Sequence, residues 1–429
     1  MSSAIRSLLA RQIWDSRGRP TVEVEIQLED GATGRAIAPA GASTGSGEAL
    51  DLRDGNERFG GYGVDRAVAG LREEIAPALI GCDASDQVGI DAHLAALDGT
   101  DQFRRLGGNA LIAASLAVAH AAAASAQLPL WRYLAGSDTA IMPVPEIQIF
   151  GGGAHASGRI DLQDFMVVPF GAGSFREALE WVAEIHLAAG HLMHEAGHIL
   201  GVADEGGYWP AFSSNEAALD ALVSAVTMAG FNPEREVGLS LDIAATQLFA
   251  GETYNLRSEG RALSVDAWFE QISSWLSNYP IRMIEDPFAE HDFESHARLV
   301  SAHGSSVQII GDDLLVTDPL RVHRAVEEGA CTALLCKPNQ AGTLSRARQA
   351  FEAAKAGGLS TIVSARSGES EDVSVAHLAV GWSARQVKVG AFTRSDRMAK
   401  WNELLRIEES LGADAIYAGK AIFAGGGDD

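Results

Sequence analysis

Six short apolar runs in the second half of the chain place the strongest limit on its fold. They recur 22 to 43 residues apart and lead into charged or polar side chains: Asp242, Glu285, Asp312, Lys337, Arg366 with Ser367, and Lys388. Most of these spacings fit one strand, one helix and two loops, which predicts βα units around a parallel sheet. In a (β/α)8 barrel the carboxyl ends of the strands open onto one mouth, where catalytic residues lie. Charged residues also mark strands that simply exit into solvent, but six of them in register favour a common site.

The first 135 residues have a different pattern, typical of an α+β unit. Residues 21–28 alternate as a half-buried strand does, and residues 64–79 and 110–134 have helical periodicity. Residues 136–145 contain a glycine and two prolines, which is typical of a linker. We therefore predict an α/β protein with an N-terminal α+β capping domain over residues 1–135 and a (β/α)8-type barrel, carrying the catalytic site, over residues 143–420.

Charge and composition exclude some partners. The formal net charge of −24 repels phosphate backbones and anionic membranes, so we expect neither nucleic acid nor a membrane as partner. Residues 110–130 carry no formal charge and are long enough to span a bilayer, but they are mostly Ala and Ser, which predicts a packed helix instead. Three cysteines, Cys82, Cys331 and Cys336, make no disulfide framework, and the N-terminus shows no signal-peptide pattern. These features predict a cytoplasmic protein.

The predicted mouth has an acidic half and a basic half. Asp242, Glu285 and Asp312 would repel one another unless a cation binds them, and all-oxygen ligation suits Mg²⁺ rather than zinc. The lysines and arginine of the next three strands would hold a substrate of high negative charge, such as a phosphorylated hydroxy acid. A lysine beside a divalent metal should have a lowered pKa and can act as a general base. Removing a proton next to a metal-bound carboxylate gives an enediolate.

Nine stretches of sequence resemble the enolase (phosphopyruvate hydratase) family, in order, from about Ile5 to Gly419. The motifs are DSRGRPTVEVE from Asp15, GASTG from Gly41, LRDG from Leu52, ADEGG from Ala203, IEDP from Ile284, GDDLLVTD from Gly311, KPNQAGTL from Lys337, RSGESED from Arg366 and RSDRMAKWNELLRIEE from Arg394. The resemblance implies an enolase-type barrel, two Mg²⁺ ions and at least a homodimer. It also implies loss of water from 2-phospho-D-glycerate to give phosphoenolpyruvate.

The resemblance also implies roles for individual residues. Lys337 matches the base that takes the C2 proton, and Glu205, with Asp164, matches the residues that help the C3 hydroxyl leave. The remaining implied roles are metal ligands Asp242, Glu285 and Asp312; Ser43, which closes over the second Mg²⁺; phosphate binders Arg366 and Ser367; carboxylate binder Lys388; and substrate-lining His155 and Gln163.

Two positions depart from the family pattern. Asp164 stands where the family has Glu, so its carboxylate can retreat by about 1.5 Å, roughly one bond length, and a displacement on the order of 1 Å can cost about 100-fold in rate. Ala365 stands where the family has His beside the phosphate-binding Arg366. Three interpretations follow: an ordinary enolase, a specialised dehydratase of a bulkier glycerate such as carboxyphosphonoenolpyruvate synthase of phosphonate antibiotic pathways, or a non-catalytic relative.

One motif points elsewhere. Residues 194–198 (HEAGH) match the H-E-x-x-H zinc pattern, which needs both histidines on one helical face. Gly197 is typical of a helix C-terminus, so we expect His198 to leave that face and no zinc to bind.

Overall fold

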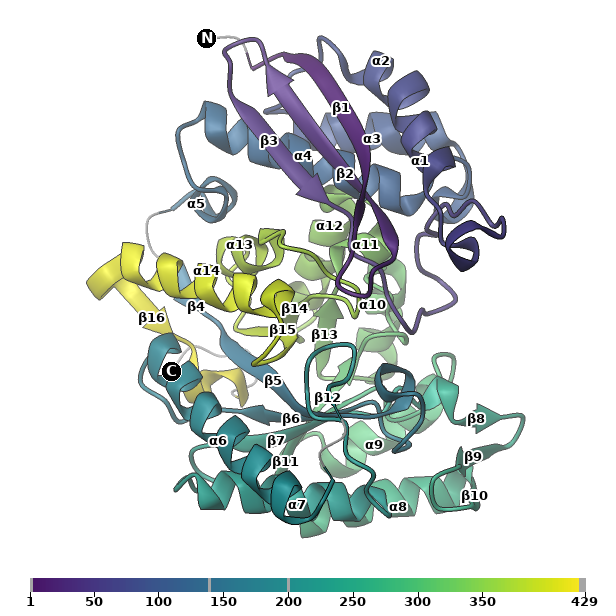
Figure 1. Ribbon diagram of the computed structural model, residues 1–429, viewed down its shortest axis with the longest axis vertical. Helices are drawn as coiled ribbons and strands as arrows, with labels where there is room; N and C mark the ends of the chain where they lie inside the picture. The colour runs from purple at the N-terminus through teal and green to yellow at the C-terminus, as the bar shows by residue number, and fades with distance from the viewer. Residues whose placement is uncertain (1–2, 138–139, 199–200, 424–429) are drawn as a thin grey trace.

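The computed structural model describes residues 3–137, 140–198 and 201–423. Its N-terminal domain begins with an antiparallel sheet of β1 (Ile5–Trp14), β2 (Pro20–Leu28) and β3 (Thr33–Ile37), at the top of Figure 1. The strand predicted at 21–28 is confirmed. Val22, Val24, Ile26 and Leu28 of β2 are fully buried, because helix α4 packs across β2 and β3.

The helices of this domain are α1 (Asp65–Gly70), α2 (Ala76–Leu79), α3 (Gln87–Asp98), α4 (Gly108–Ser125) and α5 (Leu130–Ala135), with a π-helical turn at Leu71–Ile75 joining α1 to α2. The helix predicted over 110–134 is interrupted, because Gln127 takes a positive φ and Pro129 starts a new helix. Among the described residues, α4 is the one helix long and apolar enough to cross a membrane, and 83% of it is buried inside the protein. It is the packed core helix that its composition predicts.

The second domain is a closed eight-stranded barrel. Its strands are β5 (Val144–Gly151), β6 (Asp164–Val168), β7 (Gly238–Asp242), β11 (Ile281–Glu285), β12 (Gln308–Gly311), β13 (Ala333–Cys336), β14 (Ser360–Ser364) and β15 (Gln386–Ala391). The barrel prediction is confirmed, but the sheet is not wholly parallel: β6 runs antiparallel to both β5 and β7. No crossover helix joins β5 to β6, so the chain returns as a hairpin through residues 152–163. This reversal puts Asp164, the first residue of β6, opposite Asp242, the last residue of β7.

Helices surround the barrel: α6 (Phe175–Glu195), α7 (Asn215–Met228), α8 (Val265–Asn278), α9 (Phe293–His303), α10 (Pro319–Glu328), α11 (Pro338–Ala341), α12 (Leu344–Ala356), α13 (Ser374–Gly381) and α14 (Ser395–Leu411). Several begin at an N-cap side chain that accepts a backbone N–H, such as Ser174, Ser214 and Asp318. A small sheet, β8 (Phe249–Ala250), β9 (Thr253–Leu256) and β10 (Arg261–Ser264), lies outside the barrel.

The segment 136–145, expected to be a linker, contains more structure than that. Residues 138–139 lie outside the described residues, but β4 (Ala140–Met142) pairs in parallel with β16 (Ala415–Tyr417) near the end of the chain, and β5 begins at Val144. The cysteines are free, as predicted, and Cys331 and Cys336 are buried core residues.

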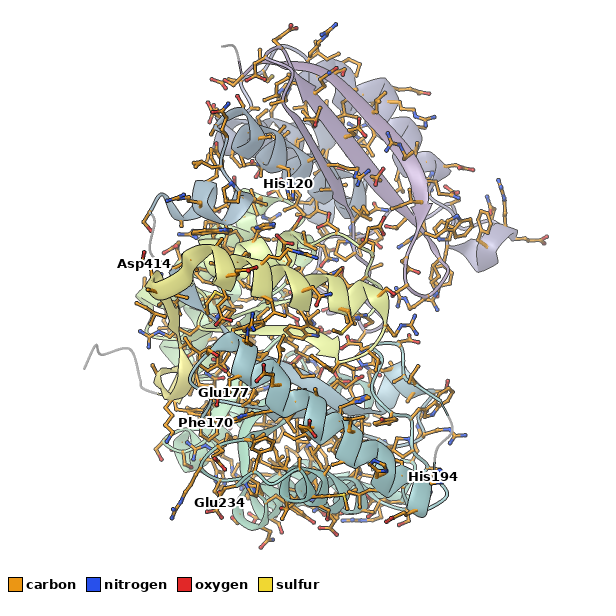
Figure 2. The ribbon with its side chains drawn as sticks, turned by 60° about the vertical axis from the view of Figure 1, so that its left-hand side comes forward. His120, Phe170, Glu177, His194, Glu234 and Asp414 are labelled. Atoms are coloured by element: carbon orange, nitrogen blue, oxygen red, sulfur yellow. The ribbon has the colours of Figure 1, made fainter. Side chains whose placement is uncertain are left out.

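Buried hydrogen bonds join the two domains. Ser115 of α4 donates to Asp91 (2.6 Å) and accepts the backbone N–H of Leu344, the first residue of α12, at 2.9 Å. Asp91 also accepts the N–H of Ser345 at 2.8 Å. Elsewhere His120, labelled at the junction of the domains in Figure 2, lies 2.8 Å from the Ser374 hydroxyl. The N-terminal domain is thus fixed against the barrel, with its loop at residues 40–45 over the barrel mouth.

Candidate active site

A pocket of about 310 Å³ opens at the carboxyl ends of the barrel strands. Nine of the twelve predicted site residues line it: Ser43, His155, Gln163, Glu205, Asp242, Lys337, Arg366, Ser367 and Lys388. The other three, Asp164, Glu285 and Asp312, are buried directly behind the lining residues and contact His155, Lys388 and Lys337 respectively. The structure therefore brings all twelve into one connected network.

The acidic half of the network comes from three neighbouring strands. Glu285 ends β11 directly beside Asp242 at the end of β7, and Asp312 follows β12. The Lys388 ammonium lies 2.9 Å from Asp242 Oδ2 and 2.7 Å from Glu285 Oε2, while Lys337 contacts Asp312. Burial and the neighbouring Asp242 raise the pKa of Glu285 well above its usual value. These buried carboxylates on neighbouring strands require cations, and the two lysines provide part of the compensation.

The donor set fits a magnesium ion. Asp242, Glu285 and Asp312 offer oxygen ligands only, which a hard cation prefers. Among the described residues, Glu285 Oε1 is buried without a hydrogen-bond partner. A buried carboxylate oxygen left without a donor is costly unless a cation reaches it. We therefore assign the metal position to this side of the pocket.

Asp286 is a residue that the strand-end pattern missed. It has a φ of 41°, which is rare for a non-glycine residue, and its carboxylate accepts the N–H groups of Asp312 (3.0 Å) and Asp313 (2.6 Å). Asp286, Asp312 and Asp313 bring one oxygen each within 4.8 Å of one another. Burial, with the Asp312 charge beside it, raises the pKa of Asp286 to about 8. Asp286 thus holds the backbone at the end of β12, from which Asp312 contacts Lys337 behind the pocket wall.

The lowered pKa that was predicted for Lys337 beside a divalent metal stays a prediction. Burial opposes the charged ammonium, but the carboxylate of Asp312 outweighs burial, so the pKa of Lys337 lies above its ordinary value. The Lys337 amine is nevertheless placed to face the pocket, because its backbone N–H donates to Thr317 at 2.9 Å and the chain then turns directly into α11.

His155, Asp164 and Glu205 form a second buried cluster beside the first, since Asp164 pairs with Asp242 across β6 and β7. Asp164 Oδ1 accepts from Gln148 and lies 2.8 Å from His155 Nδ1, and His155 Nε2 lies 3.7 Å from Glu205 Oε1 and 3.0 Å from the Ser367 hydroxyl. Burial disfavours the charged imidazole, but Asp164 and Glu205 outweigh it and raise the pKa of His155 to about 9.

The shorter side chain at position 164 has a visible consequence. Asp164 is completely buried and does not line the pocket, whereas Glu205 does. Its Oδ2 lies 3.7 Å from the Lys388 ammonium and has no hydrogen-bond partner among the described residues. The Asp164 carboxylate therefore lies behind His155, away from the pocket.

One end of the pocket is formed by residues 365–367 together with the GASTG loop. Arg366 donates to the Ser43 carbonyl at 3.1 Å, and the N–H of Ala42 donates to the Ser367 hydroxyl at 3.1 Å, so the loop lies against this end of the pocket. Gly41 is required here, since a methyl group on it would overlap the Arg366 guanidinium. Ala365 lines the pocket, and its small side chain leaves space beside Arg366.

Glu48 is the other functional residue that sequence reasoning missed. Its buried carboxylate accepts from Arg366 at 2.8 Å and 3.2 Å, which raises the pKa of Arg366 despite burial. The sequence did contain one signal for Glu48. It is an acidic residue three positions after the GASTG motif, in a segment that packs against the strand end carrying Arg366.

Comparison with known families agrees with this geometry. Residues 5–134 match the family model described as the enolase N-terminal domain, and residues 139–425 match the enolase C-terminal TIM barrel domain. The chain belongs to the enolase family. Enolases are magnesium-dependent lyases, and the predicted fold class, a capping domain followed by an enolase-type barrel, is confirmed.

The zinc-like motif lies away from this enolase site. Helix α6 ends at Glu195, Gly197 has a φ of 70°, and the N–H of His198 bonds the carbonyl of Met193 at 2.8 Å, which closes the helix. His198 is therefore outside the helix, as predicted, and Figure 2 shows His194 at the end of α6, near the edge of the molecule. No group of metal-ligating atoms forms there among the described residues.

Proposed function

We propose that this enolase-family chain removes water from 2-phospho-D-glycerate to give phosphoenolpyruvate. The observation that supports this most directly is that Lys337 and Glu205, a basic and an acidic group, line one small pocket together with the cationic Arg366 and Lys388. A pocket with an acid, a base and several cations suits a small molecule that carries both a phosphoryl and a carboxylate group.

The chain's own residues hold the two charged ends of the substrate. Arg366 presents a planar guanidinium suited to a phosphoryl group, and the Ser367 hydroxyl lies beside it. Lys388 binds the carboxylate, since its ammonium faces the pocket from the middle of β15. His155 and Gln163 close the remaining wall: the Gln163 amide donates to Asp242 at 3.1 Å and accepts from Gln247 at 3.0 Å, which fixes its orientation.

Magnesium belongs on the acidic side of this pocket. Asp242, Glu285 and Asp312 would hold the first ion, and Ser43 on the closing loop would contribute to a second. The ions would neutralise the charge that develops on the carboxylate when the C2 proton leaves.

Two proton transfers then follow from the lining residues. Lys337 accepts the C2 proton, and for this its amine must first be neutral. The ion pair between the Lys337 ammonium and Asp312 therefore has to weaken before the reaction. Glu205 donates a proton to the departing C3 hydroxyl, and His155, between Glu205 and Ser367, keeps that carboxyl in position. The buried Asp164 acts on this step only through His155.

Ala365 favours a second candidate function. Because a methyl group lines the pocket beside Arg366 where the family has an imidazole, the phosphoryl end can accept a larger group. A specialised dehydratase of a glycerate whose phosphoryl group bears an added carboxyl, as in carboxyphosphonoenolpyruvate synthase, is consistent with this space.

A steady-state assay of enolpyruvate absorbance with Mg²⁺ separates the candidates. Wild-type turnover of 2-phosphoglycerate in the usual range, on the order of 1–1000 s⁻¹, supports the first function. Weak turnover that Ala365→His improves, and Ala365→Asn does not, supports the second. If neither 2-phosphoglycerate nor the carboxyl-bearing analogue gives product, both are wrong and the chain is a non-catalytic relative.

We also propose that the protein works in the cytoplasm as a homodimer or higher homo-oligomer, without nucleic acid or membrane partners. Light scattering after size-exclusion chromatography tests the assembly: a mass of 45.2 kDa, that of one chain, would contradict it.

A further inference from the structure

A second cavity, of about 740 Å³ with the space open to solvent included, lies directly beside the active-site pocket. Four arginines line it, against two carboxylates: Arg17, Arg19, Arg53 and Arg366, with Glu48 and Asp51. We call this cavity the arginine chamber. An excess of positive charge here is notable because the whole chain carries a formal charge of −24. Such a cavity concentrates anions against the general field of the protein.

Arg17, in the wall of the chamber, has unused hydrogen-bonding capacity. Its side chain is only 6% exposed. Nη2 donates to Asp15 at 3.2 Å and to the Ala40 carbonyl at 2.9 Å, but Nη1 is buried with no acceptor among the described residues. Burial of this guanidinium lowers its pKa despite the nearby Asp15, so the charge is incompletely compensated. A buried N–H without an acceptor is costly, and an oxyanion would remove that cost.

Arg19 is a second unused donor. Its guanidinium lies 4.2 Å from the centre of the Tyr62 ring, and its side chain has no hydrogen-bond acceptor among the described residues. Arg53 differs, because its donors already bond the Pro20 carbonyl at 2.7 Å and Asp51 at 2.7 Å. Two guanidinium groups, Arg17 and Arg19, are therefore available to an incoming anion.

The chamber is connected to the active site through Arg366 and residues 40–43. Arg366 lines both cavities. Arg17 donates a hydrogen bond to the Ala40 carbonyl at 2.9 Å, and Arg366 donates one to the Ser43 carbonyl at 3.1 Å. The two guanidinium groups therefore bind opposite ends of the backbone segment 40–43. An anion in the chamber would lie beside the loop that closes on the pocket.

We propose that the arginine chamber is a second oxyanion site, which takes a phosphate or carboxylate group through Arg17 and Arg19. Two sources can supply this group. One is an additional acidic arm of the substrate, and this alternative rests on the proposed function. The other is a separate small anion. The site is distinct from the phosphoryl position at Arg366 and Ser367, because its free donors come from the N-terminal domain.

Calorimetric titration of the Mg²⁺-loaded protein with sulfate, at constant ionic strength, tests this without any turnover. We expect two sulfate sites. Ser367→Ala weakens one of them, and Arg19→Gln weakens the other by about tenfold, as the loss of a charge-assisted hydrogen bond predicts. Arg66→Gln, which removes the same charge from an exposed position of the same domain, should change neither. A single site that Ser367→Ala weakens and Arg19→Gln leaves unchanged would overturn the proposal, as would equal effects of Arg19→Gln and Arg66→Gln.

Kinetics then identify the source of the anion. If Arg19→Gln raises KM for a glycerate whose phosphoryl group bears an added carboxyl, but not KM for 2-phosphoglycerate, the substrate supplies the group. If both KM values are unchanged while sulfate binding weakens, a separate anion supplies it. Sulfate binding requires no catalytic reaction. If the proposed dehydratase function is wrong, the calorimetric result therefore still tests the second anion site.

Discussion

Replacing Asp164 by Asn should lower the pKa of His155 by about two units or more. Asp164 is the strongest of the charges that keep this imidazole protonated, and its Oδ1 lies 2.8 Å from Nδ1 inside a fully buried cluster. A carboxylate at that distance typically moves a pKa by about 1–3 units, and burial, which lowers the pKa, would then face only the more distant Glu205. His155 should therefore be at least half neutral at pH 7 in Asp164→Asn and protonated in the wild type.

The same interaction stabilises the fold in a defined pH range. Raising the His155 pKa from 6.5 to about 9 corresponds to on the order of 3 kcal/mol. Because the folded value is the higher one, this stabilisation is complete below pH 6.5 and disappears as the pH rises through 9. Asp164→Asn should therefore be destabilised relative to wild type at pH 6, and the difference should shrink by pH 9.5.

Histidine-resolved NMR titration measures the pKa, and urea unfolding at pH 6 and pH 9.5 measures the stability. Asp164→Glu is the matched control: it keeps the negative charge, so the His155 pKa should stay well above 6.5. The reasoning is refuted if His155 titrates at the same pH in the wild type and in Asp164→Asn, or if Asp164→Asn loses as much stability at pH 9.5 as at pH 6.

Three further substitutions test separate parts of the account. Glu285→Gln, which neutralises a buried metal ligand, should weaken Mg²⁺ binding by about tenfold or more in calorimetry, whereas Glu252→Gln on an exposed turn should not. Gly41→Ala should raise KM for 2-phosphoglycerate by about tenfold with little change in unfolding midpoint, because the added methyl group displaces Arg366; an unchanged KM would contradict the assigned phosphate end. Ser115→Ala leaves the buried Leu344 N–H between the domains without an acceptor. This should lower the free energy of unfolding, measured in urea, by about 1–3 kcal/mol. The control Ser224→Ala, on an exposed helix face, should change it by much less.

The barrel and most of the pocket could be predicted because six apolar runs lead into charged or polar side chains. Asp242, Glu285, Asp312 and Lys337 follow apolar residues directly, so their position along the chain fixes their position around the mouth. The same logic could not find β6. Asp164 begins that strand instead of ending it, and a residue at a strand start shows the opposite pattern.

Residues that support a site residue without lining the pocket could not be predicted from the sequence either. Glu48 and Asp286 are recognised only once the fold brings them against Arg366 and the end of β12. The contact of the Lys337 ammonium with Asp312, which raises the pKa of Lys337, was not predicted either, because it depends on side-chain geometry.

Exchange of the C2 hydrogen of 2-phosphoglycerate with deuterated solvent, in the presence of Mg²⁺, tests the central claim most directly. Because Lys337 and Glu205 are assigned to different steps, Glu205→Gln should still exchange this hydrogen while forming little phosphoenolpyruvate, and Lys337→Ala should do neither. Exchange at the wild-type rate in Lys337→Ala would show that another group removes the proton and that the assignment of the base is wrong.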